Sequence, residues 1–89
     1  MPRREIVEDQ LYADQINKYR INWRRLDEAL MSLYPALHGS PELFPLVPGT
    51  KLHRLKLVGF PGVPPLSIFF TLCEAQIVLK TAELIDLEE

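Results

Sequence analysis

Basic side chains are the residues of this sequence best suited to chemistry, and most of them fall into two groups. The group nearer the N-terminus holds Lys18, Arg20, Arg24 and Arg25. The second group holds Lys51, His53, Arg54 and Lys56, and Lys80 follows near the C-terminus. Cations that converge on one surface can hold a phosphate backbone or another anion. We therefore predict an anion site where Arg54, Lys56 and Lys80 meet on one exposed sheet face, with an ordinary solvated face as the alternative.

Motifs for other kinds of chemistry are absent from the sequence. It contains no glycine-rich phosphate loop, no paired-cysteine zinc spacing and no serine elbow. His38 has no partner at metal-ligand spacing. Cys73 is the single cysteine, so it cannot form an intramolecular disulfide, and no base lies near it in sequence to activate the thiol. We expect a packed or half-exposed thiol, and neither a metal nor a cofactor.

The composition is that of an ordinary globular protein, with 47% hydrophobic and 25% charged residues. A chain of 89 residues is long enough for one core, so we predict a single domain over residues 1–89. The net charge of −2 argues against attraction of the whole molecule to a polyanion. Because the sequence has no secretory leader and no run of roughly 18 apolar residues that could span a bilayer, we expect a cytoplasmic protein without membrane contact.

The clearest periodicity lies in the N-terminal half, where apolar residues follow one another at intervals of four and three. They are Tyr12, Ile16, Tyr19, Trp23, Leu26, Leu30 and Leu33. This spacing predicts one long helix that begins near Gln10, is capped by Asp9 and is ended by Pro35, because proline pushes the preceding residue out of the helical region. A break near residues 17–22 that makes a helical hairpin is the alternative. Aromatic members of this stripe could stack on bases, but core-facing spacing favours burial.

Alternating apolar residues in the C-terminal half predict strands over residues 52–58, 66–72 and 77–81. Leu66, Ile68, Phe70 and Leu72 share one face, which we expect to form the floor under the helix, and function should be sought on the other face. Residues 73–75 form the hairpin turn. The proline-rich segment 35–50 is expected to be an extended connector packed over a core edge. Ile6 and Val7 belong to a frayed terminus, or alternatively to a short edge strand. The predicted class is α+β: a long N-terminal helix, or a helical hairpin, packed on a small antiparallel sheet of three to four strands.

Residues from about Trp23 to Ile85 resemble the RelE/ParE-type toxins of bacterial toxin–antitoxin pairs. The resemblance rests on WRRLDEAL in the helix, Pro35 after it, FPLVPGTKLHRLKL leading into the first strand, and the hairpin segments PPLSIFFTL and AQIVLKTAELI. It implies a small antiparallel sheet with helices on one side, in a cytoplasmic protein that is neutralised by an antitoxin segment wrapped across it. Ribonucleases of the family cut ribosome-bound messenger RNA with scattered basic residues, commonly with a Tyr or His near the C-terminus. The resemblance carries this role to Arg54, Lys56 and Lys80.

The C-terminal segment 81–86 departs from the family pattern, because it is acidic and contains no Arg, His or Tyr. Cleavage of a phosphodiester needs a general acid or a cation where charge develops, and an acidic segment opposes the approach of RNA. We therefore expect a toxin-like component that acts by binding a protein, the antitoxin, with weak or absent ribonuclease activity. One alternative is an active messenger RNA endonuclease that uses Arg54, Lys56 and Lys80 on RNA or the ribosome. Another is a structural module that associates with further copies of itself.

Overall fold

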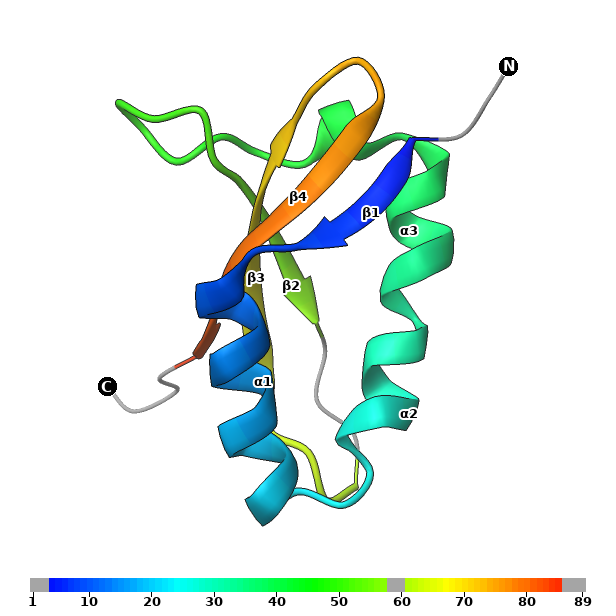
Figure 1. The fold of residues 1–89 in the computed structure, drawn as a ribbon, viewed down its shortest axis with the longest axis vertical. Helices are drawn as coiled ribbons and strands as arrows, with labels where there is room; N and C mark the ends of the chain where they lie inside the picture. The colour runs from blue at the N-terminus through cyan, green and yellow to red at the C-terminus, as the bar shows by residue number, and fades with distance from the viewer. Residues whose placement is uncertain (1–3, 58–60, 86–89) are drawn as a thin grey trace.

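The computed structural model is an α+β fold in which helices cover one face of a four-stranded sheet (Figure 1). It describes residues 4–57 and 61–85. The elements in chain order are β1 (Glu5–Glu8), α1 (Gln10–Asn22), α2 (Leu26–Met31), α3 (Leu33–Gly39), a 3-10 helix η1 (Pro41–Leu43), β2 (His53–Leu57), β3 (Leu66–Leu72) and β4 (Gln76–Leu84). The α+β class is confirmed, with differences in the helices and in the sheet.

The sheet is mixed, not purely antiparallel as predicted. Its strand order is β1-β4-β3-β2; β2–β3 and β3–β4 are antiparallel, and β1 runs parallel to β4. Parallel neighbours need a long connection between them, and the helices together with the other two strands provide it. The interpretation of Ile6 and Val7 as a frayed terminus is therefore wrong. Ile6 pairs with Ile77 and packs against the core, so this short strand is part of the fold.

The core lies between the helices and one face of the sheet, which we call the inner face. Leu66, Ile68 and Phe70 of β3 are fully buried there, as their alternation predicted. The neighbouring strands and the helices supply the remaining large side chains of the core. These include Leu55, Leu57, Ile77 and Leu79 from the sheet and Tyr12, Ile16, Leu26, Leu30, Leu33 and Leu37 from the helices.

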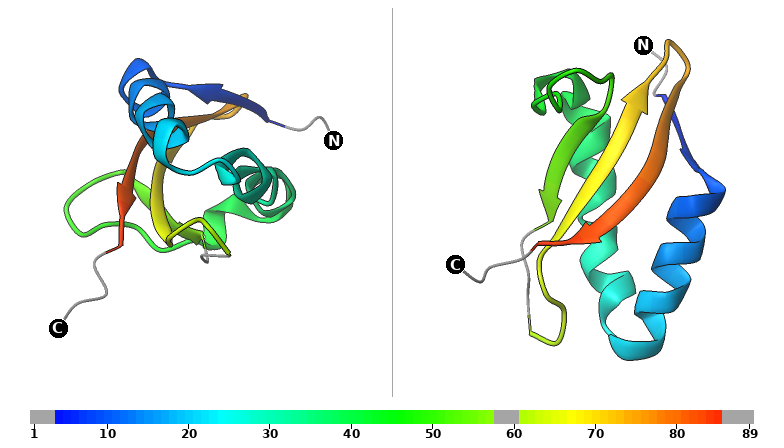
Figure 2. Two further views of the ribbon diagram at one scale, coloured as in Figure 1. Left: turned by 90° about the horizontal axis from the view of Figure 1, so that it is seen from below. Right: turned by 90° about the vertical axis from the view of Figure 1, so that its left-hand side faces the viewer.

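The long helix predicted over residues 10–34 is broken into separate helices. α1 ends at Asn22, Trp23 adopts an extended backbone conformation, and α2 begins at Leu26. The two arms, α1 and the α2–α3 run, lie on the same side of the sheet (Figure 2). Because both arms turn their apolar residues towards the same inner face, the apolar intervals continue through the turn. Periodicity alone therefore could not reveal the break.

Pro35 does not end a helix, as the sequence had predicted, but lies in the first turn of α3, which spans Leu33–Gly39. The backbone N–H groups of a first helical turn have no partner within the helix, so proline costs little there. The prediction failed because the chain had already left one helix and begun another at Ser32–Leu33.

The connector that follows packs along the edge of β2, which confirms the expectation for its second half. The Val47 N–H donates to the Leu52 carbonyl at 2.8 Å, and the Arg54 N–H donates to the Pro45 carbonyl at 2.9 Å. Phe44 meets the ring of Phe70 edge-on, with 6.0 Å between ring centroids. The predicted strand residue Val58 and the predicted loop residues Gly59 and Phe60 lie outside the described residues.

Candidate functional site

The face of the sheet opposite the inner face is not covered by any helix of residues 4–57 or 61–85, and we call it the open face (Figure 2). Side chains alternate along a strand, so the register defines the residues of this face. They are Glu5 and Val7 of β1, Arg54 and Lys56 of β2, Ser67, Phe69 and Thr71 of β3, and Gln76, Val78, Thr81 and Glu83 of β4. The loop between η1 and β2 projects on this side, away from the helices (Figure 2). The open face therefore combines apolar residues near its middle with cations at the β2 edge.

A hollow of about 320 Å³ lies between this loop and the open face. Its lining is formed by Pro45, Leu46, Val47, Pro48, Arg54 and Phe69, and we call it the Arg54 hollow. The hollow exists because the connector is hydrogen-bonded to the edge of β2 at both Arg54 and Leu52, which holds the prolines beside the sheet. Phe69 pairs with Arg54 across the two strands and forms part of the same lining.

Arg54 is half-buried, and its guanidinium is held by one side-chain hydrogen bond. Its Nε donates to the hydroxyl of the buried Ser67 at 2.9 Å. Within residues 4–57 and 61–85, no carboxylate forms an ion pair with Arg54, and its two Nη groups have no hydrogen-bond acceptor. The remaining donors of this side chain are thus available to an anion outside the chain.

Lys56 lies two residues farther along β2 on the same face, where its side chain is exposed. It also makes no ion pair with any described carboxylate. The structure therefore brings together two of the three predicted site residues, Arg54 and Lys56, on adjacent open-face positions of one strand.

Lys80 is engaged elsewhere. Its ammonium lies 2.8 Å from Oδ2 of Asp9, at the start of α1. β4 is separated from β2 by β3, and Lys80 occupies an irregularity where the register shifts by one residue. The Lys80 ammonium, together with backbone N–H groups at the start of α1, lowers the pKa of the Asp9 carboxyl. This ion pair links β4 to the start of the helical layer.

His53 points to the inner face, as its place in the alternation predicted. Its ring stacks on Phe70 with 5.3 Å between centroids, and Nδ1 lies 2.8 Å from the carbonyl oxygen of Phe44. A carbonyl can only accept, so Nδ1 carries the proton of that hydrogen bond. The histidine fastens the connector to the core and takes no part in the open face.

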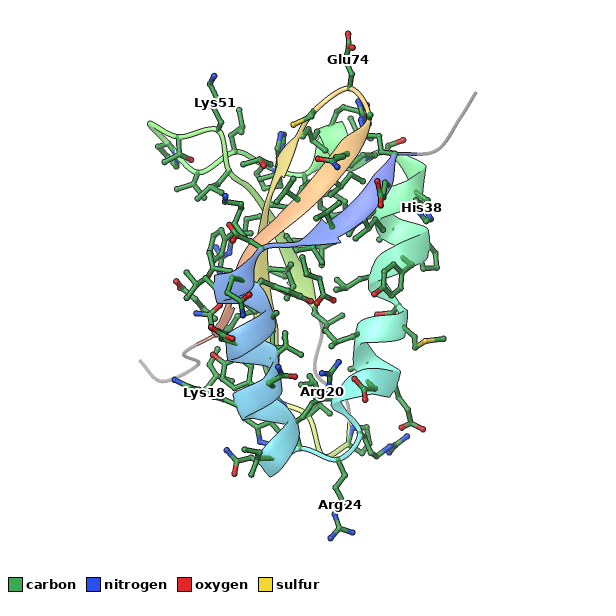
Figure 3. The ribbon with its side chains drawn as sticks, in the orientation of Figure 1. Lys18, Arg20, Arg24, His38, Lys51 and Glu74 are labelled. Atoms are coloured by element: carbon green, nitrogen blue, oxygen red, sulfur yellow. The ribbon has the colours of Figure 1, made fainter. Side chains whose placement is uncertain are left out.

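In the basic group nearer the N-terminus, two of the four cations pair with acids of the helical layer. Arg20 pairs with Asp27 at 2.9 Å, and Arg25 pairs with Glu28 at 2.6 Å. Lys18 and Arg24 point away from the body of the protein (Figure 3). The helical cations therefore form separate surface contacts and not one anion site.

Acid–base groups are scarce on the open face. Each described tyrosine and His38 belongs to a helix, and His53 faces inward. The carboxylates among the described open-face residues are Glu5, at the β1 edge, and Glu83, which is opposite Ser67 in the register. Asp86, part of the acidic segment noted in the sequence, lies outside the described residues. In the part of the chain that is described, the open face thus offers cations and apolar surface but neither an imidazole nor a phenol.

The remaining candidates from the sequence are separate from this face. Cys73 is exposed in the β3–β4 turn. His38 lines a shallow hollow on α3 with Tyr34, Pro35 and Gly39. No cluster of three or more potential metal ligands occurs among residues 4–57 and 61–85, and no helix described there is long and apolar enough to cross a bilayer.

Comparison with known proteins gives no family for this chain. No family model, no curated protein and no solved structure matches it. The open face is therefore interpreted from its own geometry.

The Arg54 hollow could have been only partly foreseen. Alternation in β3 placed Phe69 on the same face as Arg54 and Lys56, and the connector carries the apolar pair Leu46 and Val47. Pro48-Gly49 is a local turn signal that could have shown the return of residues 45–48 to the β2 edge, because the Thr50 N–H donates to the Val47 carbonyl at 3.1 Å and Gly49 has a φ of 78°. The contact with Phe69 could not be foreseen in this way, since it depends on the pairing of β2 with β3.

Proposed function

We propose that the chain is a toxin-like component of a toxin–antitoxin pair of the RelE/ParE type and that it acts chiefly by binding a partner protein. The observation that supports this most directly is the open face. In the part of the chain that the structure describes, this sheet surface is not covered by a helix, and it carries an apolar hollow and two cations without an ion-pair partner. Helices packed on one side of a small sheet also agree with what the sequence resemblance implies. An antitoxin segment that wraps across the protein would find on this face both apolar surface and cations to contact.

Weak or absent ribonuclease activity is part of the proposal. Cleavage of RNA requires proton transfer and stabilisation of charge on the phosphate. Arg54 and Lys56 could bind a phosphate, but the described open face has no histidine or tyrosine to move a proton. Glu83 adds negative charge to the same face, which disfavours RNA.

Co-expression with the product of an adjacent open reading frame tests the proposal. The tagged chain is expected to co-purify with that product and to arrest growth when expressed without it. The substitution Phe69→Asp places a charge on the open face and is expected to abolish co-purification. Ile21→Asp is the matched control, because Ile21 is 82% exposed on α1 and should tolerate the charge without loss of binding. A chain that binds no neighbouring product and does not affect growth would contradict the proposal.

An active messenger RNA endonuclease is the second candidate, supported by the adjacent cations Arg54 and Lys56. The test is alanine substitution of Arg54, Lys56 and Lys80 together, with growth arrest and messenger cleavage as the measurements. Loss of both would support catalysis, whereas unchanged cleavage would eliminate it. Lys80→Ala alone serves as a control for the Asp9 ion pair, since that substitution leaves the β2 cations in place.

Self-association through the open face is the third candidate, and light scattering distinguishes it from the others. A dimer that dissociates on Phe69→Asp substitution would favour a structural module. A monomer over the accessible concentration range would remove this candidate.

A further inference from the structure

The Arg54 hollow has an apolar lining with one cation in it. The apolar lining residues are Pro45, Leu46, Val47, Pro48 and Phe69, and the cation is Arg54. Its volume of about 320 Å³ lies at the small end of ligand pockets, which suits one or two side chains better than a large cofactor. Leu46 is 55% exposed at this hollow. A large aliphatic side chain placed here would cover apolar surface that the fold itself leaves in water.

The cations of the same region, Arg54 and Lys56, form no ion pair with a carboxylate of residues 4–57 or 61–85. The described ion pairs join Arg4 to Glu42, Arg20 to Asp27, Arg25 to Glu28, and Lys80 to Asp9. None of them involves Arg54 or Lys56. Within the described ranges, Arg54 is half-buried with only Nε engaged, so its Nη groups can donate to a carboxylate without breaking an existing contact. Arginine binds a carboxylate in a planar, two-point geometry that a single ammonium does not match.

We infer that the Arg54 hollow binds a short peptide segment of a partner protein in which a large aliphatic residue is followed by an aspartate or glutamate. The aliphatic side chain fills the space between the prolines and Phe69, and the carboxylate pairs with the Arg54 guanidinium. This inference rests on the proposed function, because it specifies the chemistry of the partner that the open face would bind. An RNA backbone fits less well, because a phosphate chain needs a row of cations and Lys80 is already paired with Asp9.

Amide chemical-shift titration of the isotopically labelled full chain tests the inference with three capped tetrapeptides. The first contains leucine followed by aspartate between glycines, the second replaces the aspartate with asparagine, and the third replaces the leucine with glycine. The leucine–aspartate peptide is expected to shift the amides of Leu46, Val47, Arg54 and Phe69. Loss of the carboxylate is expected to weaken binding by about three- to tenfold, the usual net contribution of a single hydrogen bond. Loss of the leucine should weaken it further.

Two variants separate charge from packing. Arg54→Met keeps an apolar side chain in the hollow and is expected to remove the preference for aspartate over asparagine. Lys56→Met is the matched control, because Lys56 lies on the same strand and face but does not line the hollow, so the preference should persist. Leu46→Asp is expected to abolish peptide binding, and the exposure of this residue means that the fold should be retained. The amide spectrum of each variant reports directly whether it is folded.

Each result decides for or against the inference. Equal binding of the aspartate and asparagine peptides to the unsubstituted chain, or no shift at millimolar peptide, would overturn it. Shifts of the same amides by a short oligouridylate without a peptide response would assign the hollow to RNA and also overturn it. Co-purification with a neighbouring product in the absence of peptide binding would leave the proposed function standing and place the partner elsewhere. Peptide binding without co-purification would support the inference about the Arg54 hollow and contradict the proposed function.

Discussion

The two faces of β3 come from alternate residues of one strand, yet they differ in almost every physical property. On the inner face, Ile68 and Phe70 are fully buried beneath the helices. On the open face, Phe69 and Thr71 are only half-buried and have no helix above them. The side chains of the inner face form the core and stabilise the fold. Among residues 4–57 and 61–85, the open face keeps half-buried apolar side chains and cations without an ion-pair partner, and this difference is why we propose partner binding there.

Substituting adjacent phenylalanines gives the largest expected contrast between the faces. Phe70→Ala removes a ring that contacts both Phe44 and His53 and should cost about 3–5 kcal/mol of unfolding free energy. That is a large share of the roughly 5–15 kcal/mol available to a small domain. Phe69→Ala should cost about 1–2 kcal/mol, because its ring is only half-buried. Urea denaturation measures both values, and equal losses would mean that the open face is also part of the core.

Enlarging neighbouring residues of β4 should show a smaller contrast. Ala82 is fully buried, its carbonyl accepts from the Tyr19 hydroxyl at 3.2 Å, and its N–H donates to Gln15 at 2.8 Å. Ala82→Leu must push α1 away and should cost about 1–3 kcal/mol. Thr81→Leu on the open face should stay within about 0.5 kcal/mol of the unsubstituted chain. Thermal unfolding compares the two, and a tolerated leucine at position 82 would indicate a loosely packed helical layer.

Alkaline pH should weaken the helical layer through Tyr12. Burial, with a further contribution from the Glu8 carboxylate, raises the pKa of the Tyr12 hydroxyl above its ordinary value of 10.0. Unfolding exposes this hydroxyl and lets it ionise, so stability is intact below pH 10.0 and falls as the pH rises beyond it. One such group can lower the free energy of unfolding by at most about 1.4 kcal/mol for each unit of pH.

Tyr12→Phe should reduce this alkaline loss while leaving stability near neutral pH little changed. Denaturation midpoints measured across the alkaline range provide the test. Unfolding with the same alkaline dependence in both proteins would show that another group is responsible.

The smallest effect is expected from the ion pair between Asp9 and Lys80. Lys80, as the largest cause, lowers the folded-state pKa of Asp9 below 3.8, so the pair stabilises the protein above that pH and ceases to do so as the pH falls through the folded value. Asp9→Asn keeps a side chain that suits the start of a helix but removes the charge.

The thermal unfolding midpoints of the unsubstituted chain and of Asp9→Asn should differ slightly at about pH 6 and should be the same at about pH 2. Lys80→Met is the matched substitution and should reproduce the difference at about pH 6. A difference that persists in acid would mean that Asp9 acts through helix capping and not through the ion pair.

Local patterns in the sequence predicted much of the sheet and core. Alternation placed Leu66, Ile68 and Phe70 on the buried face, and the short turn at residues 73–75 predicted the β3–β4 hairpin. Alternation also placed His53 on the opposite face of β2 from Arg54 and Lys56, and the structure agrees. These predictions succeeded because successive side chains of a strand point to opposite faces, so the face of each residue follows from its position relative to its neighbours in the sequence.

The helical break, the parallel β1 strand and the partner of Lys80 were decided by tertiary structure. The apolar intervals continue through Trp23 because both helical arms pack on one surface, and Ile6 pairs with Ile77 only after the chain has folded back on itself. Lys80 meets Asp9 for the same reason, which removes it from the site predicted with Arg54 and Lys56.

The sequence by itself therefore determined which residues face inward and which cations face outward along each strand. Only the tertiary structure decided which of those cations remain unpaired and which apolar segment lies beside them. The physical reason is the range of the interactions. Alternation is a property of consecutive residues, whereas the Asp9–Lys80 ion pair and the meeting of Phe69 with the proline-rich segment require residues far apart in the chain to meet at a fixed distance.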